Sequence, residues 1–213
     1  MHQKLPEARN HPAISDKTDA WQRGRLTWQA CLVTDDTQRR LILLRHAKSD
    51  WTEDLPDHDR PLAKRGRRDA PVIGRWLRDR GYLPDVVVCS TACRTRQTWD
   101  LVAAELGDAT PEVRFESRAY GASSHTLLYL ARELPPGCRA ALLVGHNPGI
   151  SELATALAAG LTGSAEGTHP RRISFPTAGV AVLEFAADWP DLAPGHAQLA
   201  DVVIPADLQR ETH

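Results

Sequence analysis

Short, mostly apolar runs that end abruptly in polar residues recur along this chain. The clearest are residues 40–45, 85–89 and 139–144, and each has the length of one strand. A strand that is apolar on both faces belongs inside a sheet that is covered on both sides. These runs therefore predict the central strands of an α/β fold.

Segments of helical length, several of them closed by a glycine, separate these runs. Helices are predicted over residues 62–80, 93–106, 123–134 and 148–159. Further strands are predicted over residues 112–115, 180–185 and 199–204. The predicted helix ends are Gly81, Gly107 and Gly160, and the predicted N-cap is Ser123. Strands that alternate with helices imply a three-layer α/β/α sandwich with a mainly parallel central sheet.

The N-terminal part of the chain does not follow this alternation. It is polar and irregular, and we expect residues 1–38 to form a flexible or loosely packed extension. A short added strand is an alternative there, because apolar and polar residues alternate over 26–32. The remaining residues, 39–213, have the size of one domain with a large core.

Composition and charge argue against several partners and compartments. The formal net charge is −1, so no global field would draw the chain to nucleic acid or to a membrane surface. No apolar run approaches the roughly 20 residues that cross a bilayer, and the N-terminus lacks the apolar core of a secretory signal. The four cysteines show no C-x-x-C spacing, which favours free thiols in a cytoplasmic protein.

One local stretch departs from this balance of charge. Between Arg60 and Arg80, Lys and Arg outnumber Asp and Glu by eight to two. We interpret the stretch as the solvated face of the helix predicted there, with a surface for an anionic partner as the alternative.

Polar clusters follow the three central strands, at the point where each strand ends. Arg45-His46 closes the first apolar run, and Gly145-His146-Asn147 follows the third. The second run leads into a polar segment that contains Ser90 and Arg94. Ligands bind at the carboxyl ends of the strands in an open α/β sheet, so we expect the clusters to share one cleft. Arginine grips phosphoryl oxygens bidentately and histidine can attack phosphorus, which favours phosphoryl chemistry.

These clusters, taken together and in order, resemble a known family. Arg45-His46, the pattern S-x-x-x-R-x-x-Q-T over 90–98, and Gly145-His146-Asn147 are similar to the histidine phosphatase superfamily, also called the phosphoglycerate mutase-like family. Four blocks resemble its SixA-type phosphohistidine phosphatases: LLRHAKSDW at 43–51, DHDRPL at 57–62, KRG at 64–66 and FPTA at 175–178. The resemblance covers roughly residues 40–205.

The resemblance implies a metal-independent phosphatase that needs no cofactor. His46 would be the nucleophile and would carry a transient phosphoryl group, while Arg45, Arg94 and His146 would surround the phosphoryl oxygens. The chemistry of the residues agrees, because an imidazole with a pKa of about 6.5 is available in its neutral form near physiological pH. Phosphoryl transfer depends mostly on positioning of the reacting groups and on electrostatic stabilisation of the transition state, which fixed cations supply.

Three further residues are candidates for substrate binding, each with a structural alternative. Asn147 could orient His146, or form a plain turn before Pro148. Ser90 could touch phosphate, although capping of the following helix is the favoured role for it and for Thr98. Lys48 could lie at the rim of the cleft or in a solvated loop.

A general acid is harder to find in the sequence. In the mutase-like branch a carboxylic acid precedes a Tyr-Gly pair, but Glu116 lies one residue too far from Tyr120 to match that spacing. It is therefore a weak candidate, and Glu53, Asp54 and Asp57 are weaker still. The lack of an acid favours phosphohistidine as the substrate, because an imidazole leaving group, with a pKa of about 6.5, needs less protonation than an alkoxide.

Several alternatives remain beside a phosphatase for protein phosphohistidine. A phosphatase for small phosphate esters or nucleotides is the nearest, and a non-catalytic module that binds a phosphoprotein is the other. A cysteine phosphatase is rejected, because Cys89 lies too close to Arg94 and too far from Arg96 for that chemistry. The nine histidines lack close pairs of the kind that bind zinc.

Overall fold

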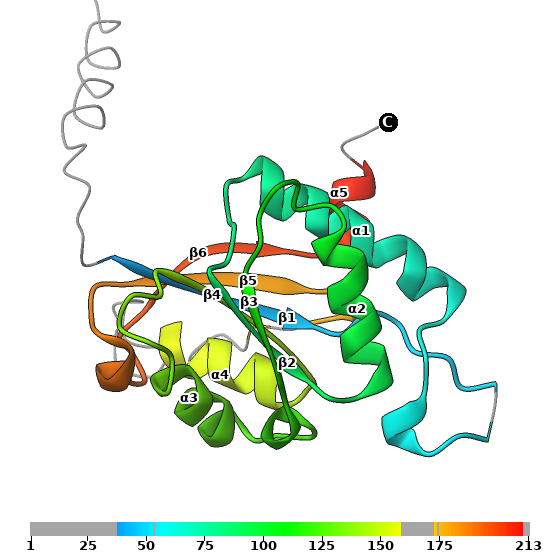
Figure 1. Cartoon of the computed structure of the whole chain (residues 1–213), viewed down its shortest axis with the longest axis horizontal. Coiled ribbons are helices and arrows are strands. Elements are labelled where there is room, and N and C mark those ends of the chain that lie inside the picture. The colour runs from blue at the N-terminus through cyan, green and yellow to red at the C-terminus, as the bar shows by residue number, and fades with distance from the viewer. Residues whose placement is uncertain (1–37, 53, 159–172, 174, 211–213) are drawn as a thin grey trace, which may run out of the picture. The chain divides into compact units, whose positions relative to one another are not determined.

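The structure, a computed structural model, describes residues 38–52, 54–158, 173 and 175–210 (Figure 1). These residues belong to one compact unit, Thr37–His213. The predicted N-terminal extension, apart from Gln38, and the predicted helix stop Gly160 lie outside the described residues. No helix of the described part is both long and apolar enough to cross a membrane.

A six-stranded sheet with the order β3-β2-β4-β1-β5-β6 forms the centre of the fold. Its strands are β1 (Arg39–Arg45), β2 (Val86–Ser90), β3 (Glu112–Glu116), β4 (Ala140–Gly145), β5 (Val180–Phe185) and β6 (Gln198–Val203). All six were predicted from the apolar runs, with bounds that differ by at most one residue at either end. The runs are apolar because the central strands are buried on both faces: β2 and β4 are buried at every position.

The sheet is mixed, so the mainly parallel sheet that was expected is found only in part. The pairs β3–β2, β2–β4 and β4–β1 are parallel, but β5 pairs antiparallel with both β1 and β6. The segment between β5 and β6 holds no α-helix, only the short 3₁₀ helix η4 (Trp189–Asp191). Parallel neighbours need a crossover, usually a helix, so this short connection makes β5 and β6 antiparallel.

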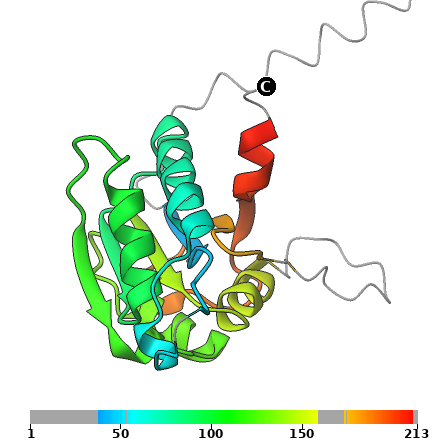
Figure 2. The ribbon, with the colours of Figure 1, turned by 90° about the vertical axis from the view of Figure 1, so that its right-hand side faces the viewer.

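Helices cover both faces of the sheet (Figures 1 and 2). On one face α1 (Lys64–Asp79) packs against α2 (Cys93–Ala103) and against α5 (Pro205–Arg210). On the other face α3 (Ser124–Arg132) packs against α4 (Gly149–Ala158). The sequence analysis did not predict α5, because one and a half turns are too short to show a helical period.

Alternation along β1 divides its side chains between two cores. Leu41 and Leu43 pack with the residues of α3 and α4, while Ile42 and Leu44 pack with those of α1 and α2. Each such side chain contributes on the order of 1.5–3 kcal/mol on burial. The two cores hold the sheet rigid on both sides, so the polar residues at the ends of its strands have a fixed frame.

The predicted helix boundaries are partly confirmed by the backbone. Gly81 adopts a left-handed φ of 69° just beyond α1. Gly107 has the same φ, but α2 already ends at Ala103, so the predicted end at residue 106 is too late. The Ser123 hydroxyl accepts a hydrogen bond from the Thr126 N–H at 3.2 Å and caps α3 as predicted. The N-cap of α2 is Ala92, which has no side-chain oxygen, so the capping role favoured for Ser90 and Thr98 is wrong.

Candidate active site

Three strand ends meet at one edge of the sheet. β2, β4 and β1 are adjacent and parallel, so the residues that follow them emerge on the same side. The His46 N–H donates to the Gly145 carbonyl at 3.0 Å, which joins two of the polar clusters directly. A cavity of about 160 Å³ opens here, and its described lining residues are Arg45, His46, Lys48, Ser49, Trp51, Asp57, Arg94 and Thr177.

His46 is buried at the end of β1, with 8% of its surface exposed. Its Nδ1 lies 2.8 Å from the carbonyl oxygen of Ala47. A carbonyl only accepts, so Nδ1 carries the proton and Nε2 keeps the lone pair. Burial first, and then the charges of Arg94 and Arg45, lower the pKa of His46 to about 4. The ring is therefore neutral at pH 7, and Nε2 can act as a nucleophile.

The backbone on either side of the His46 ring is tied to two other segments. The Ala47 N–H donates to Thr98 Oγ1 at 3.0 Å, and the Thr98 hydroxyl donates to the Arg94 carbonyl at 2.6 Å. The Ala178 N–H donates to the His46 carbonyl at 3.1 Å. Thr98 thus connects the end of β1 to the first turn of α2, which is the role the structure gives it in place of a cap.

Arg94 lies in the first turn of α2 and is buried. Its Nη1 donates to the main-chain carbonyl of Asp57, and its Nη2 donates to Asp57 Oδ2 at 2.9 Å. Nη2 also lies 3.3 Å from His146 Nδ1. The guanidinium therefore joins α2 to the 3₁₀ helix η2 (Asp57–Asp59) and to the residue after β4.

His146 stands beside His46, with 5.1 Å between the ring centroids. Because arginine only donates, Nδ1 of His146 is an acceptor toward Arg94, and Nε2–H donates to Ser90 Oγ at 2.8 Å. Burial, the neighbouring His46 and Arg94 lower the pKa of His146 to about 3. Arg94 therefore fixes the tautomer of His146, and Ser90 accepts the proton that this tautomer carries on Nε2. Neither His146 nor Ser90 is among the described lining residues of the cavity.

Arg45 and Asn147 converge on one carbonyl group. Arg45 Nη1 donates to the Phe175 oxygen at 2.7 Å, and Asn147 Nδ2 donates to the same oxygen at 2.9 Å. Arg45 lines the cavity, whereas Asn147 is not among its described lining residues. The Arg45 Nε atom is buried without a hydrogen-bond partner, as is Asn147 Oδ1. Asn147 thus orients the segment that carries Phe175, and Lys48 lies exposed at the rim.

The carboxylates are arranged differently from what the sequence suggested. Glu116 accepts from the Arg118 N–H at 2.9 Å and from Arg118 Nη2 at 2.7 Å, and these bonds lower its pKa. It does not line the described cavity, nor does Asp54, and Glu53 lies outside the described residues. Asp57 does line it.

Asp57 and Tyr120 are the site residues that sequence reasoning undervalued or missed. The Tyr120 hydroxyl donates to Asp57 Oδ2 at 2.7 Å, and its ring meets His146 edge-on at 5.5 Å. Two sequence signals were available for them. Asp57 opens the DHDRPL block, and Tyr120 precedes Gly121, whose positive φ of 59° marks a turn.

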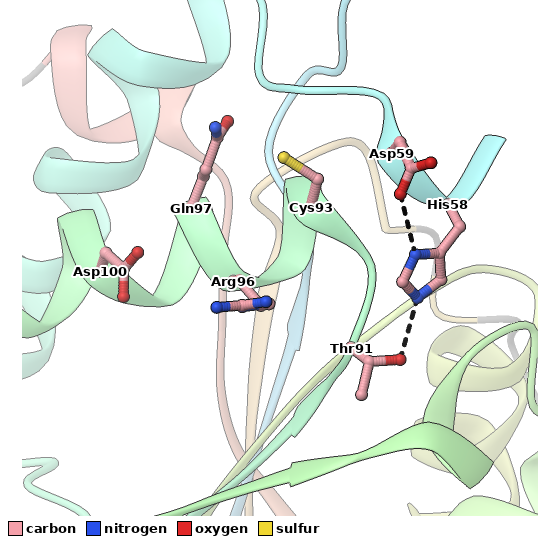
Figure 3. Close-up of a pocket in the computed structure, with 7 residues that line it drawn as sticks. All are labelled: His58, Asp59, Thr91, Cys93, Arg96, Gln97 and Asp100. Carbon is pink, nitrogen blue, oxygen red and sulfur yellow. Dashed lines mark hydrogen bonds and ion pairs between the residues drawn. The ribbon is translucent and has the colours of Figure 1, made fainter. Parts of the chain in front are cut away.

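A second cavity, of about 320 Å³, is lined by other residues of η2 and α2 and by Thr91 (Figure 3). η2 contributes His58 and Asp59, and α2 contributes Cys93, Arg96, Gln97 and Asp100. His58 Nε2 lies 3.0 Å from Thr91 Oγ1, and both residues line it. Its described lining has two carboxylates, Asp59 and Asp100, and one arginine, Arg96. The cavity at His46, called here the nucleophile cavity, has three cations and one carboxylate.

The chain is similar to known proteins in sequence and in fold. The chain matches the model of the histidine phosphatase superfamily (branch 1) over residues 41–126. It is 42% identical over 164 residues to an uncharacterised protein of Mycobacterium tuberculosis, covering 76% of this chain and 99% of the relative.

Two solved structures are similar over nearly their whole length. One is a protein of Nakamurella multipartitia assigned as a phosphohistidine phosphatase SixA, with 36% identity, a TM-score of 0.67, and coverage of 79% of this chain and 96% of that one. The other, from Agrobacterium tumefaciens and with the same assignment, has 30% identity, a TM-score of 0.63, and coverage of 78% and 98%.

Proposed function

This chain belongs to the SixA-like branch of the histidine phosphatase superfamily, and on that basis we propose that it hydrolyses phosphohistidine on a protein substrate through a phosphoryl group carried by its own His46. The family and the solved relatives support a phosphatase. The observation that carries the proposal is the state of the His46 ring, which is buried, neutral and protonated on Nδ1.

In the first half of the proposed reaction the Nε2 lone pair of His46 attacks phosphorus. The bond from phosphorus to the leaving group breaks, and its electron pair stays with that group. Arg45 and Arg94 line the same cavity, so their fixed positive charges can stabilise the negative charge on the transferring oxygens. Burial of Arg94 makes this stabilisation stronger than it would be in water.

The chemistry of the leaving group favours phosphohistidine over a phosphate ester as the substrate. Among the described lining residues the single carboxyl group is Asp57, and hydrogen bonds from Tyr120 and Arg94 lower its pKa. An ionised carboxylate cannot protonate an alkoxide, but an imidazole leaving group, with a pKa of about 6.5, depends less on an acid. The partner is then a phosphorylated protein of the cytoplasm, the compartment that the free thiols Cys89, Cys93 and Cys138 favour.

A turnover comparison tests this function directly. Wild-type protein and His46→Ala are each assayed with a phosphohistidine peptide, an aryl phosphate and a sugar phosphate. We expect the wild type to hydrolyse the first two readily and the sugar phosphate at least ~10²-fold more slowly, since general acid catalysis is typically worth ~10²–10⁴-fold.

The His46→Ala protein is expected to lose all three activities while remaining folded. Retained activity in His46→Ala would contradict the mechanism. A sugar phosphate that proved the best substrate would instead favour the phosphatase for small phosphate esters.

A further inference from the structure

The proposed function leaves one step without an assigned residue, the attack of water on phospho-His46. We propose that Asp57 is the general base for this step, an inference that rests on the proposed function. On sequence grounds the residue was a weak candidate for a general acid, in the loop expected after the nucleophile. The tertiary structure places its carboxylate in the wall of the nucleophile cavity.

The two oxygens of the Asp57 carboxylate have different surroundings. Oδ2 accepts from Tyr120 at 2.7 Å and from Arg94 Nη2 at 2.9 Å. Among the described residues, Oδ1 accepts only from Arg60 Nη1, at the longer distance of 3.3 Å. Oδ2 is therefore the anchored oxygen, and Oδ1 is the one with capacity to accept a hydrogen bond from water.

Tyr120 and Arg94 give this carboxylate the support that a base requires. They hold it in a fixed orientation, as the third group does in a nucleophile–base–orienter arrangement. They also lower the pKa of Asp57, so the carboxylate stays ionised at neutral pH. An ionised carboxylate can take a proton in the second half of the reaction and has none to give in the first.

The other groups at the cavity are poorer bases. Arg45, Lys48 and Arg94 are cations, which only donate. His46 would itself carry the phosphoryl group in this step. His146 is not among the described lining residues, and it faces Arg94 through Nδ1 and Ser90 through Nε2, so neither of its ring nitrogens is available to water.

The step balances without a further reactant. The oxygen of a water molecule bonds to phosphorus as the bond from phosphorus to His46 Nε2 breaks, and the electron pair of that bond returns to Nε2. One proton of the water passes to Asp57 Oδ1. Inorganic phosphate leaves, and Asp57 returns the proton to solvent.

The test separates formation of the phosphoenzyme from its decay. Wild type, Asp57→Asn and Asp59→Asn are each mixed with a radiolabelled aryl phosphate, and the label on His46 is followed by rapid quench. Asp59 is a matched control, because it lies in the same 3₁₀ helix but its exposed carboxylate contacts His58 and does not line the nucleophile cavity.

We expect Asp57→Asn to form phospho-His46 within a few-fold of the wild-type rate and to lose it at least ~10²-fold more slowly, so that the label accumulates. Asp59→Asn should match the wild type in both phases. Unchanged decay in Asp57→Asn would overturn the inference. An equal loss in both phases would overturn it too, because Asp57 would then act only by positioning Arg94. No label on His46 in the wild type would instead refute the proposed function.

Discussion

At the scale of single residues, the site depends on two imidazoles that burial keeps neutral. His46 and His146 stand 5.1 Å apart, and both have lowered pKa values, of about 4 and about 3. Each ring is also fixed in one tautomer, by the Ala47 carbonyl and by Arg94 with Ser90. Because the nucleophile is neutral and oriented before the substrate binds, little free energy is needed to bring it to the reactive state.

The pH dependence of His46 follows from this burial. Protonation removes the Nε2 lone pair, so phosphoenzyme formation should persist through pH 6.5 and fall as the pH drops through about 4. Nitrogen NMR of the imidazoles should report the titration and the Nδ1–H tautomer directly. A midpoint for His46 near its unperturbed value of about 6.5 would show that the ring is not desolvated.

At the scale of elements, α1 supports the loop that follows the nucleophile. The Ala63 N–H, just before the helix, donates to the Lys48 carbonyl at 2.9 Å, and Asp50 N–H donates to Pro61 at 2.8 Å. Gly66 in the first turn lets the helix approach this backbone closely. A Cβ there would overlap the Lys48 carbonyl oxygen and lie 2.9 Å from the Lys48 nitrogen.

Gly66→Ala is therefore expected to destabilise the protein, although alanine is the better helix former. The added methyl group meets backbone, which cannot swing away, so we expect a loss of about 1–3 kcal/mol in the free energy of unfolding. Urea denaturation measures it. Gly137→Ala is the matched control, because a Cβ there has open space, and it should stay within about 0.5 kcal/mol of the wild type. Equal stability of both variants would show that the backbone at Lys48 shifts to make room for the added methyl group.

At the scale of the whole molecule, the fold collects cations from distant parts of the chain at one edge of the sheet. Arg45 ends β1, Arg94 begins α2, and Lys48 lies at the rim of the cavity that they share. The helices on both faces hold these elements in place. The negative charge of a phosphoryl group can therefore be balanced by positively charged side chains alone.

Activity should then survive chelation. We expect turnover of an aryl phosphate in excess EDTA to stay within twofold of the untreated rate, because Arg45 and Arg94 supply the positive charge. A loss that Mg²⁺ or Zn²⁺ restored would place the reaction in a metal-assisted class instead.

Much of this architecture was predictable from the sequence because the signals are local. An apolar run such as 139–144 has to be buried, and the position of Gly81 marks where α1 ends. Two residues that line the cavity could be predicted too, since His46 and Arg94 follow apolar strands where no core needs them. Motifs in order along the chain were sufficient for the family.

The tertiary structure decided what depends on direction and on distance through space. β5 runs antiparallel to both β1 and β6, and apolar periodicity along a strand carries no information about its direction. Asp57 and Tyr120 lie 63 residues apart, and only the folded chain brings their hydroxyl and carboxylate to 2.7 Å. Glu116 is nearer to the family spacing, yet Arg118 holds its carboxylate outside the cavity. The sequence alone determined which residues the site could use, because the apolar runs and the order of the motifs can be read from the chain itself. Side-chain direction and the pairing of distant charges were settled by packing.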